Sequence, residues 1–481
     1  MRAMLVLGAA LGALALPAAA QARLIYQTCI KAPAEMVTPC ATTASDNAIQ
    51  EPSQISISPD GSTAYVVGQG VGSVPNSGNV GIFSTAGGLT QTGQLPNAAA
   101  VDAGSWPTSS VVSPDGNNVY ITALSGVWTY TRSRADGSLS SPSCFGGTST
   151  TCPSQSAELG NAPNRAVISS DGHYVYVVND SPSADPPAQT SVSEFSRDPA
   201  TGALTHIGCL STVSEGSCTV VPSNMLGLQD LVISPDGRHA YGAAYPRSTD
   251  GAVIVFSRAP TTGALTYGSC YGQSGGCIST RPGSHIPLAV AITPDGTQMY
   301  VSYGNSAGTN NISAYSVDRT SGSLTFAGCI ANSLPSCSPS PDEFYDNGQL
   351  LPSADGRDLY VMDNAEAIAA YARDPATGVL TYAGCYSWPG RTGFGGHCTN
   401  TAAGLFYSTD MTLSPDGGQL YAVSLGNNPW SGPGGSLADT GGGVVDQFRR
   451  VASIAAATAP PAILTIVAHI APGGLSFDKR A

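Results

Sequence analysis

Three charged residues occupy one position of a sevenfold repeat and could together bind an anion or activate water. Seven times in this chain an Asp-Gly pair is followed by a Tyr five residues after the Asp. A Ser or Thr lies two residues before each of these Asp residues. The position four residues before that Ser or Thr is polar in most of the seven repeats. Its occupants are Gln54, Ser109, Arg165, Asp230, Ala289, Gln349 and Asp410. Arg165 could hold a carboxylate or polarise a carbonyl, and Asp230 or Asp410 could act as a general base.

The same residues also have a structural interpretation. An Arg and two Asp side chains are a common way to balance charge, so Arg165 could simply neutralise both acids across a water-filled channel. In the functional interpretation, Arg165, Asp230 and Asp410 are the candidate catalytic residues, and Gln54 and Gln349 bind a ligand beside them. The sequence leaves both interpretations open.

The repeat itself predicts the elements that position these residues. Its spacing of 55 to 65 residues indicates a fold built of similar units. Asp-Gly favours the positive φ angles of a tight hairpin turn, which would join a first and a second strand. In the fourth repeat the four expected strands are 231–234, 239–244, 252–258 and 265–270. Four antiparallel strands repeated seven times predict an all-β fold, the seven-bladed β-propeller.

The seventh repeat lacks a fourth strand of its own. No Leu-Thr segment follows Phe448, whereas Leu24-Ile-Tyr-Gln-Thr-Cys29 matches Leu265-Thr-Tyr-Gly-Ser-Cys270 at its Leu, Tyr and Cys. We therefore expect the N-terminal strand to complete the last blade. This arrangement would close the ring and leave no free sheet edge.

Twelve cysteines fall into six short pairs, each just after a fourth strand. The pairs are Cys29 with Cys40, Cys144 with Cys152, Cys209 with Cys218, Cys270 with Cys277, Cys329 with Cys337, and Cys385 with Cys398. An even number at regular positions predicts disulfides in an exported chain. Each should contribute roughly 2–3 kcal/mol of stability. Metal sites favour closely spaced motifs such as C-x-x-C, which are absent here, so we expect neither a metal nor a cofactor.

The two ends of the chain differ in composition from the repeats. Residues 1–22 have the pattern of a secretory signal peptide, with Arg2, an apolar stretch over 4–16 and a small-residue site over 20–22. That apolar stretch is too short to span a bilayer. We therefore predict a secreted protein, extracellular or periplasmic, with the propeller over 23–450. Residues 451–481 are rich in Ala and Pro, which predicts a mobile tail.

The charge balance limits the partners. The chain has 19 basic and 32 acidic residues, a formal net charge of −13. An acidic surface disfavours nucleic acids and anionic membranes as partners. It could also serve only to keep an exported protein soluble. We expect a monomer with no membrane span.

A second group of candidate residues maps to the rim opposite the Asp-Gly turns. Trp106 and His285 precede first strands, Trp388 lies in the last disulfide loop, and Trp430 lies in a long loop of the seventh repeat. Loop length varies on this face, whereas the Asp-Gly turns keep one length. Length variation confined to one face usually marks the binding face. These rings could instead pack the loops against the blades.

The repeat motifs resemble those of a known family. Ser-Pro-Asp-Gly-x-x-x-Tyr-Val units, as at 58–66 and 113–121, and Asp-Pro-Ala-Thr-Gly-x-Leu-Thr units at 198–205 and 374–381 are similar to those of lactonase-type seven-bladed propellers. That family includes enzymes like 6-phosphogluconolactonase and muconate cyclase, and surface proteins with YVTN repeats. The resemblance covers about 25–450. These motifs form turns and strands, and no catalytic set of the family maps onto this chain.

Two functions follow. The first is an extracellular binding protein that takes a lactone-like or carbohydrate-like small molecule, or a protein, at its top rim and central channel. The alternative is a secreted lactone hydrolase that uses Arg165, Asp230 and Asp410 in the channel. The resemblance favours the hydrolase. The disulfides, the acidic surface and the rim tryptophans favour the binding protein.

Overall fold

The computed structural model describes most of the propeller and little of either end. The described residues are 23–32, 40–43, 49–69, 78–95, 107–123, 126–146, 152, 154–155, 159, 163–181, 189–246, 250–273, 275–279, 286–304, 310–331, 334–339, 347–363, 367–388, 398, 400–402, 404–425, 443–451, 469–471 and 474–476. The predicted signal peptide lies outside them, as do Trp106, His285 and Trp430. Within the predicted tail, only 451 and a two-stranded hairpin are described, β34 (His469–Ala471) with β35 (Gly474–Ser476).

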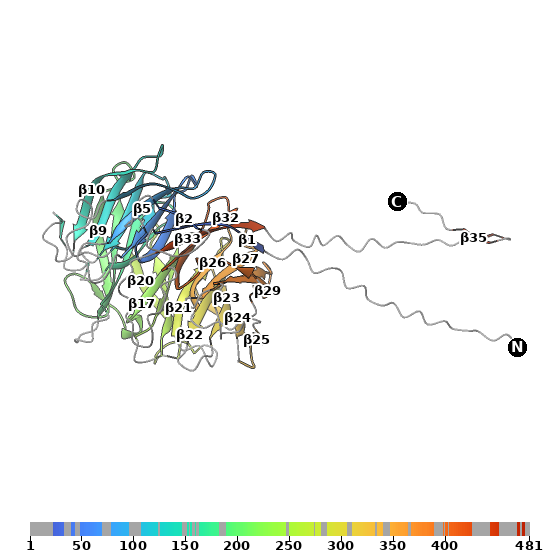
Figure 1. The fold of residues 1–481 in the computed structure, drawn as a ribbon. Helices are drawn as coiled ribbons and strands as arrows, with labels where there is room; N and C mark the ends of the chain where they lie inside the picture. Colours follow the sequence, from blue (N-terminus) through green and yellow to red (C-terminus); the bar gives the residue numbers. More distant parts are fainter. Residues whose placement is uncertain are drawn as a thin grey trace, which may run out of the picture.

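Seven β-sheets follow one another around a closed ring (Figure 1). Their innermost strands are β3 (Pro52–Ile57), β7 (Pro107–Val112), β12 (Pro163–Ile168), β17 (Leu228–Ile233), β21 (Ile286–Ile292), β26 (Asn347–Pro352) and β31 (Ser408–Leu413). Each innermost strand contacts that of the next blade, and β31 contacts β3. The predicted seven-bladed propeller is therefore confirmed.

The remaining long strands continue each blade outward in antiparallel order. The second strands are β4 (Thr63–Gly68), β8 (Asn118–Ala123), β13 (Tyr174–Ser181), β18 (His239–Ala244), β22 (Gln298–Gly304), β27 (Asp358–Asp363) and β32 (Gln419–Ser424). The third strands are β5 (Asn79–Ser84), β9 (Gly126–Arg132), β14 (Gln189–Arg197), β19 (Ala252–Arg258), β23 (Asn311–Val317), β28 (Ala367–Arg373) and β33 (Val444–Val451). The fourth strands of the first six blades are β6 (Thr90–Leu95), β10 (Leu139–Gly146), β15 (Leu204–Ser211), β20 (Leu265–Gly272), β24 (Leu324–Ala331) and β29 (Leu380–Ser387).

The apolar side chains of each sheet pack against the neighbouring blade. One cluster, for example, joins Val192 of blade 3 to Ile254 of blade 4. Among the described residues, Ser223–Met225 forms a 3-10 turn. In this part of the chain no helix is long or apolar enough to cross a membrane.

The N-terminal strand closes the ring as predicted. β1 (Arg23–Lys31) pairs antiparallel with β33, and the register places Leu24 opposite Arg450 and Cys29 opposite Asp446. Figure 1 shows β1 and β2 beside β32 and β33, so the two ends of the repeat lie side by side. The last blade is therefore built from both ends of the propeller chain.

All six predicted disulfides are present. They also add something that the four-strand description missed, because each one ties the loop after a fourth strand back onto that strand. In five blades the returning chain forms a short parallel fifth strand. These strands are β2 (Ala41–Thr42), β11 (Ser154–Gln155), β16 (Thr219–Val220), β25 (Ser338–Pro339) and β30 (Asn400–Thr401). In blade 4 the same return is a single bridge from Ile278 to Tyr271.

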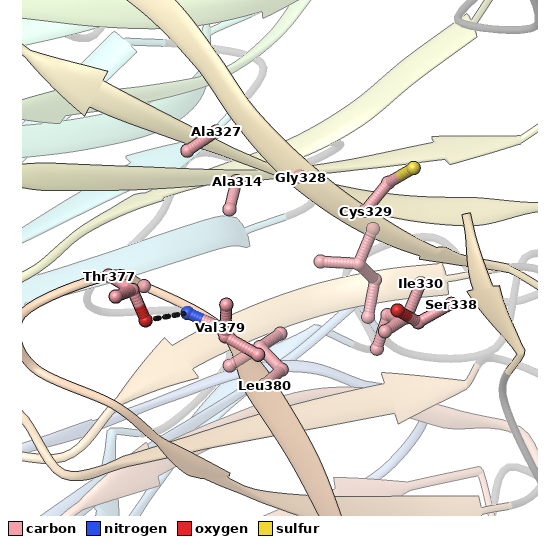
Figure 2. Close-up of a pocket in the computed structure, with 11 residues that line it drawn as sticks. Ala314, Ala327, Gly328, Cys329, Ile330, Ser338, Thr377, Val379 and Leu380 are labelled. Atoms are coloured by element: carbon pink, nitrogen blue, oxygen red, sulfur yellow. Dashed lines mark hydrogen bonds between the residues drawn. The ribbon is translucent and has the colours of Figure 1, made fainter. Parts of the chain in front are cut away.

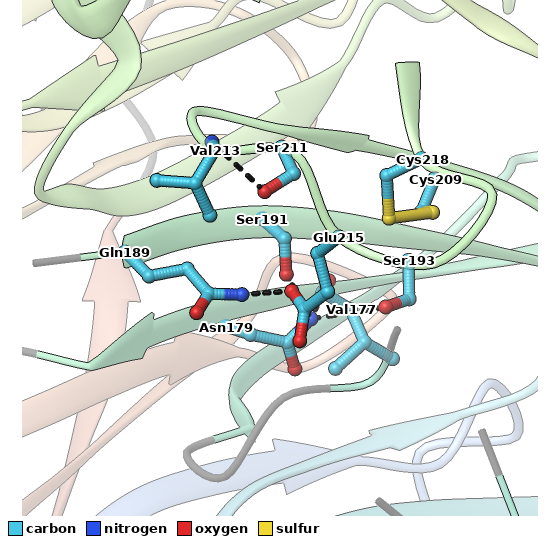
Figure 3. The surroundings of a disulfide bond; sticks show 10 residues. All are labelled: Val177, Asn179, Gln189, Ser191, Ser193, Cys209, Ser211, Val213, Glu215 and Cys218. Carbon is cyan, nitrogen blue, oxygen red and sulfur yellow. Dashed lines mark hydrogen bonds between the residues drawn. A yellow bond between two sulfur atoms is a disulfide. The ribbon is translucent and has the colours of Figure 1, made fainter. Parts of the chain in front are cut away.

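Blade 3 shows how such a loop is held (Figure 3). The Cys209–Cys218 disulfide links the fourth strand to the residue before β16. Within the same loop, Glu215 accepts a hydrogen bond from the Gln189 side chain of β14. The loop is thus fixed at both a covalent and a polar contact, which keeps the outer edge of the blade covered.

The Asp-Gly motif forms the turn that its sequence predicts. Ser58 Oγ donates to Asp60 Oδ1 at 2.6 Å and accepts from the Thr63 amide at 3.0 Å. The seven turn glycines have φ between 66° and 71°, the left-handed region that favours Gly. This explains why the Ser or Thr, the Asp and the Gly recur together.

The motif also joins neighbouring blades. A buried Arg two residues after the third-strand aromatic reaches back to the Asp and Tyr of the preceding blade. Arg197, for example, donates to Tyr120 Oη and to Asp115 Oδ2, both at 2.7 Å, and to the Gly172 carbonyl at 3.0 Å. Its counterparts are Arg132, Arg258, Arg373 and Arg450. The corresponding residues of blades 1 and 5 are Thr85 and Val317, so two seams lack this Arg.

Candidate functional site

The central channel contains a cavity of about 520 Å³ that is lined by all seven innermost strands. Of the predicted site residues, Gln54, Arg165, Asp230 and Gln349 line it, together with Ser109. Asp410 is not among the lining residues and is 5% exposed. The alignment of the repeats therefore located one layer of the channel, with Asp410 behind its wall.

Most side chains of this layer accept a hydrogen bond from the next blade. In each case the donor is a backbone N–H of the next blade. It belongs to the residue that directly follows the corresponding position of the repeat in that next blade. Gln54 Oε1 accepts from Ser110, Ser109 Oγ from Ala166, Asp230 Oδ2 from Val290, Gln349 Oε1 from Met411, and Asp410 Oδ2 from Ile55. These distances are 2.6–3.0 Å. We call these five acceptors the channel belt.

The belt has a clear physical cause. The innermost strand of a blade has a partner on one side only, so part of its backbone faces the channel unpaired. A buried N–H without an acceptor costs about 1–3 kcal/mol. Because any side-chain oxygen of suitable length satisfies it, Gln, Ser and Asp can all occupy the position. Gln54, Gln349 and Asp410 thus have a structural role beside any part they take in ligand binding or catalysis.

Two of the seven positions depart from the belt. Ala289 has no acceptor to offer the next blade. Arg165 is a donor and instead forms an ion pair with Asp230, with Nε 3.2 Å from Oδ1. The Arg165 side chain is 37% exposed, and beyond this ion pair no hydrogen-bond partner is found for it among the described residues. The geometry therefore directs a cation into the cavity at one point.

The two acids differ in their surroundings. Asp230 Oδ1 accepts from its own neighbour, Leu231 N–H, at 3.0 Å and forms the ion pair with Arg165, while Oδ2 accepts from Val290, so both of its oxygens are engaged. Burial raises the pKa of Asp410 to about 7, although Arg165 and the Ile55 amide favour its charged form. The charge of Asp230 raises the pKa of Arg165, which stays protonated. Near neutral pH, Asp410 can therefore exist in both protonation states.

The predicted rim residue Trp388 lies apart from the channel cavity. It is half-buried and packs edge-to-face on Phe406, with ring centroids 4.9 Å apart. Phe406 in turn contacts Tyr407, which is 38% exposed. This contact agrees with the packing alternative, and the binding role of all four rim residues stays a prediction. In the described part of the chain no group of His, Cys, Asp or Glu could hold a metal ion.

Sequence reasoning missed the belt and the buried arginines. The arginines could have been found, because an aromatic-x-Arg pattern recurs in five of seven third strands. The belt had no such signal, since its members share an oxygen atom and not a residue type. Ser109 belongs to the belt through its hydroxyl alone.

A closed ring of seven sheets around a central channel defines the class of protein, a seven-bladed β-propeller. Residues 145–337, less than half of the chain, match the family described as Lactonase, 7-bladed beta-propeller. The resemblance of the repeat motifs to lactonase-type propellers is therefore confirmed. No curated protein matches this chain.

Several solved structures are similar in fold. A putative 6-phosphogluconolactonase from Bacteroides uniformis ATCC 8492 is 18% identical, with 72% of this chain and 86% of that chain covered and a TM-score of 0.49. The periplasmic gluconolactonase of Pseudomonas aeruginosa is 21% identical, with 69% and 85% covered and a TM-score of 0.49. A β-propeller domain from Myceliophteria thermophila is 12% identical, with 84% and 97% covered and a TM-score of 0.49. The similarity to these three proteins concerns the fold alone.

Proposed function

We propose that this protein is an exported, lactonase-like propeller that binds a small anionic molecule in its central channel through Arg165. The observation that carries the proposal is the departure of Arg165 from the belt. Where five neighbours satisfy backbone amides, Arg165 presents a partly exposed guanidinium to a cavity of about 520 Å³. Cavities of roughly 300–1,000 Å³ are typical of small-molecule sites.

The chemistry of Arg165 favours a carboxylate. Asp230 contacts Nε, so both terminal nitrogens are left for a ligand. A planar guanidinium binds a carboxylate with two parallel hydrogen bonds. Gln54 and Gln349 line the same cavity and add amide groups suited to hydroxyl or lactone oxygens. A sugar acid or a lactone that carries a carboxylate combines both features.

The channel is favoured over the top rim as the binding site. Trp388, the one described rim tryptophan, is occupied by packing against Phe406. Export is supported by six disulfides, which persist in oxidising compartments. An extracellular or periplasmic location is compatible with them.

Lactone hydrolysis is the second candidate, and one observation favours it. A carboxyl with a pKa of about 7, as at Asp410, is well suited to general-base chemistry near neutral pH. Against it, Asp410 is 5% exposed and its Oδ2 is bound to Ile55. Asp230 is likewise engaged at both oxygens. We therefore rank binding above hydrolysis.

Calorimetric titration with gluconate, glucuronate and glucuronolactone tests the proposal. We expect Arg165→Ala to weaken binding of the acids at least tenfold, because a hydrogen bond to a charged group contributes about 1.5–3 kcal/mol. Arg134→Ala is the matched control, since Arg134 is an exposed Arg on the Asp-Gly face. Equal affinity of both variants for these acids would exclude the channel as their site.

A pH-stat assay on the same molecules and on simple γ- and δ-lactones separates the two candidates. We expect no turnover by the mature chain. Turnover that collapses in Arg165→Ala and in Asp410→Asn would make hydrolysis the function. Turnover that survives both substitutions would place the chemistry outside the channel.

A further inference from the structure

The seam between blades 5 and 6 contains a second cavity, of about 210 Å³. Figure 2 shows residues that line it, and none of them lines the channel cavity. The walls of this cavity come from the third, fourth and fifth strands of blade 5, and from the turn 377–379 and the first residue of β29 in blade 6. They include Ala314, Gly328, Ile330, Val379 and Leu380. Most of these side chains are apolar, and no charged residue lines the space.

The seam between blades 3 and 4 contains a side-chain acceptor that the described part of the seam between blades 5 and 6 lacks. Glu194 pairs with Gly208 just before the bulge of blade 3, as Ala314 pairs with Gly328 in blade 5. The Glu194 carboxylate crosses the seam and accepts from the Leu265 amide at 3.0 Å. The residue that corresponds to Leu265 in blade 6 is Leu380, which lines the cavity. Ala314 therefore stands where blade 3 has a long acceptor.

A different solution is used between blades 4 and 5. There Tyr271 Oη accepts from the Leu324 amide at 3.0 Å. Ile330 occupies the position of Tyr271 in blade 5, since each lies opposite the second residue of its third strand. Ile330 has no polar atom in its side chain. In the seam between blades 5 and 6, the two positions that fill the other two seams therefore carry a short or an apolar side chain.

Two further observations support an open space with a free donor. A Cβ on Gly208 would lie 3.2 Å from the Glu194 carboxylate, whereas one on Gly328 would meet nothing within 4 Å. Leu380 pairs with Arg373 in the same register as Leu265 with Arg258. Its N–H therefore points away from its own blade, as that of Leu265 does, and no side-chain acceptor for it is found among the described residues.

We propose that this seam cavity, defined by Ala314, Gly328, Ile330, Val379 and Leu380, binds a compact neutral molecule that carries one carbonyl oxygen. The oxygen takes the place of the Glu194 carboxylate or the Tyr271 hydroxyl and accepts from the Leu380 amide. The apolar body fills the space that a longer side chain fills in the other seams. A neutral carbonyl suits the site because no cation lines it to balance a carboxylate. Val379, which is 55% exposed, marks the opening.

The test titrates cyclohexanone as the probe into the 15N-labelled mature chain. The chemical shifts of the backbone amides are followed by NMR. We expect saturable shifts of the Leu380 amide and its neighbours. Cyclohexylammonium has the same ring and no acceptor, and we expect at least tenfold weaker binding of it although the chain is acidic. Cyclohexanecarboxylate measures the preference for a neutral acceptor, and tighter binding of it than of cyclohexanone would overturn the neutral class.

Two variants copy the neighbouring seams and should each close the site. Ala314→Glu reproduces Glu194, and Ile330→Tyr reproduces Tyr271. We expect both to lower cyclohexanone affinity at least tenfold, with the melting temperature measured to confirm folding. Arg165→Ala should leave it unchanged, which separates this site from the channel. Unaltered binding in both folded filling variants, or no binding to the unmodified chain, would overturn the proposal.

Discussion

On the Asp-Gly face, five of the seven seams between blades are joined by the same three residue types. A buried Arg contacts a Tyr hydroxyl of the preceding blade and lies beside the turn Asp of that blade, as Arg197 does with Tyr120 and Asp115. In the channel, five seams are joined by side-chain oxygens that come from Gln, Ser or Asp. Both regions link consecutive blades, but only the first does so with a constant motif.

The difference reflects how much geometry each contact demands. Arg132, Arg197 and Arg258 each reach a hydroxyl, a carbonyl and a carboxylate at once, and only a guanidinium has that arrangement of donors. The channel amide needs one acceptor at a suitable distance. Where the demand is light, residue type can vary, and a departure such as Arg165 costs the fold little. The channel wall is therefore the part of the molecule that can acquire a ligand site.

Removal of a buried seam arginine should have the largest effect. We expect Arg197→Ala to lower the free energy of unfolding by about 3–5 kcal/mol, because Asp115, Tyr120 and Asn118 lose a buried charged partner. The midpoint of guanidinium denaturation without reductant measures this loss.

Arg319→Ala is the matched control in the seam between blades 4 and 5. The Arg319 side chain is 56% exposed and lies 3.7 Å from Asp236. We expect a change of about 0.5 kcal/mol or less, as for other exposed pairs. Similar midpoints for the two variants would show that the repeated contacts do not stabilise the ring.

The second prediction concerns pH and arises from buried carboxyls. Burial raises the pKa of Glu194, Asp410 and Asp446 to about 7. The folded state therefore binds protons more tightly than the unfolded state, and stability should fall as pH rises from about 4 to about 8. The carboxylates of the Asp-Gly turns have the opposite effect, because stability should fall as they are protonated near pH 3. Asp115, for instance, has a lowered pKa through its bonds to Ser113 and Arg197, although burial opposes this.

Unfolding midpoints between pH 4 and pH 8 test this, with Asp410→Asn beside the unmodified chain. At about 1.4 kcal/mol per pKa unit, one such carboxyl contributes roughly 1–4 kcal/mol to the decline. The Asn variant keeps an acceptor for the Ile55 amide but does not titrate, so its decline should be smaller. If the variant and the unmodified chain lost stability in parallel, Asp410 would not titrate in this range.

The propeller, its closure and its six disulfides could be predicted, because each depends on a motif that recurs at fixed spacing. The short fifth strands could not, since two residues such as Thr219 and Val220 carry no strand pattern. They form because the Cys209–Cys218 disulfide returns the chain to β15. In the channel the alignment located the right layer. Alternation of side chains could not show that Asp410 turns to an amide of another blade, which depends on the packing of blade 7 against blade 1.

The smallest expected effects come from adding or removing one belt acceptor. Gln349→Leu leaves the Met411 amide without its acceptor at 2.6 Å, and should cost about 1–3 kcal/mol. Ala289→Ser is the reverse change, because it offers an oxygen to the next blade where none exists. Ser109 shows that a Ser is long enough, since its Oγ lies 3.0 Å from the Ala166 amide. We therefore expect the Ser variant to gain about 0.5–1.5 kcal/mol, measured as a higher denaturation midpoint. A loss in both variants would mean that the belt positions are selected by packing and not by their acceptors.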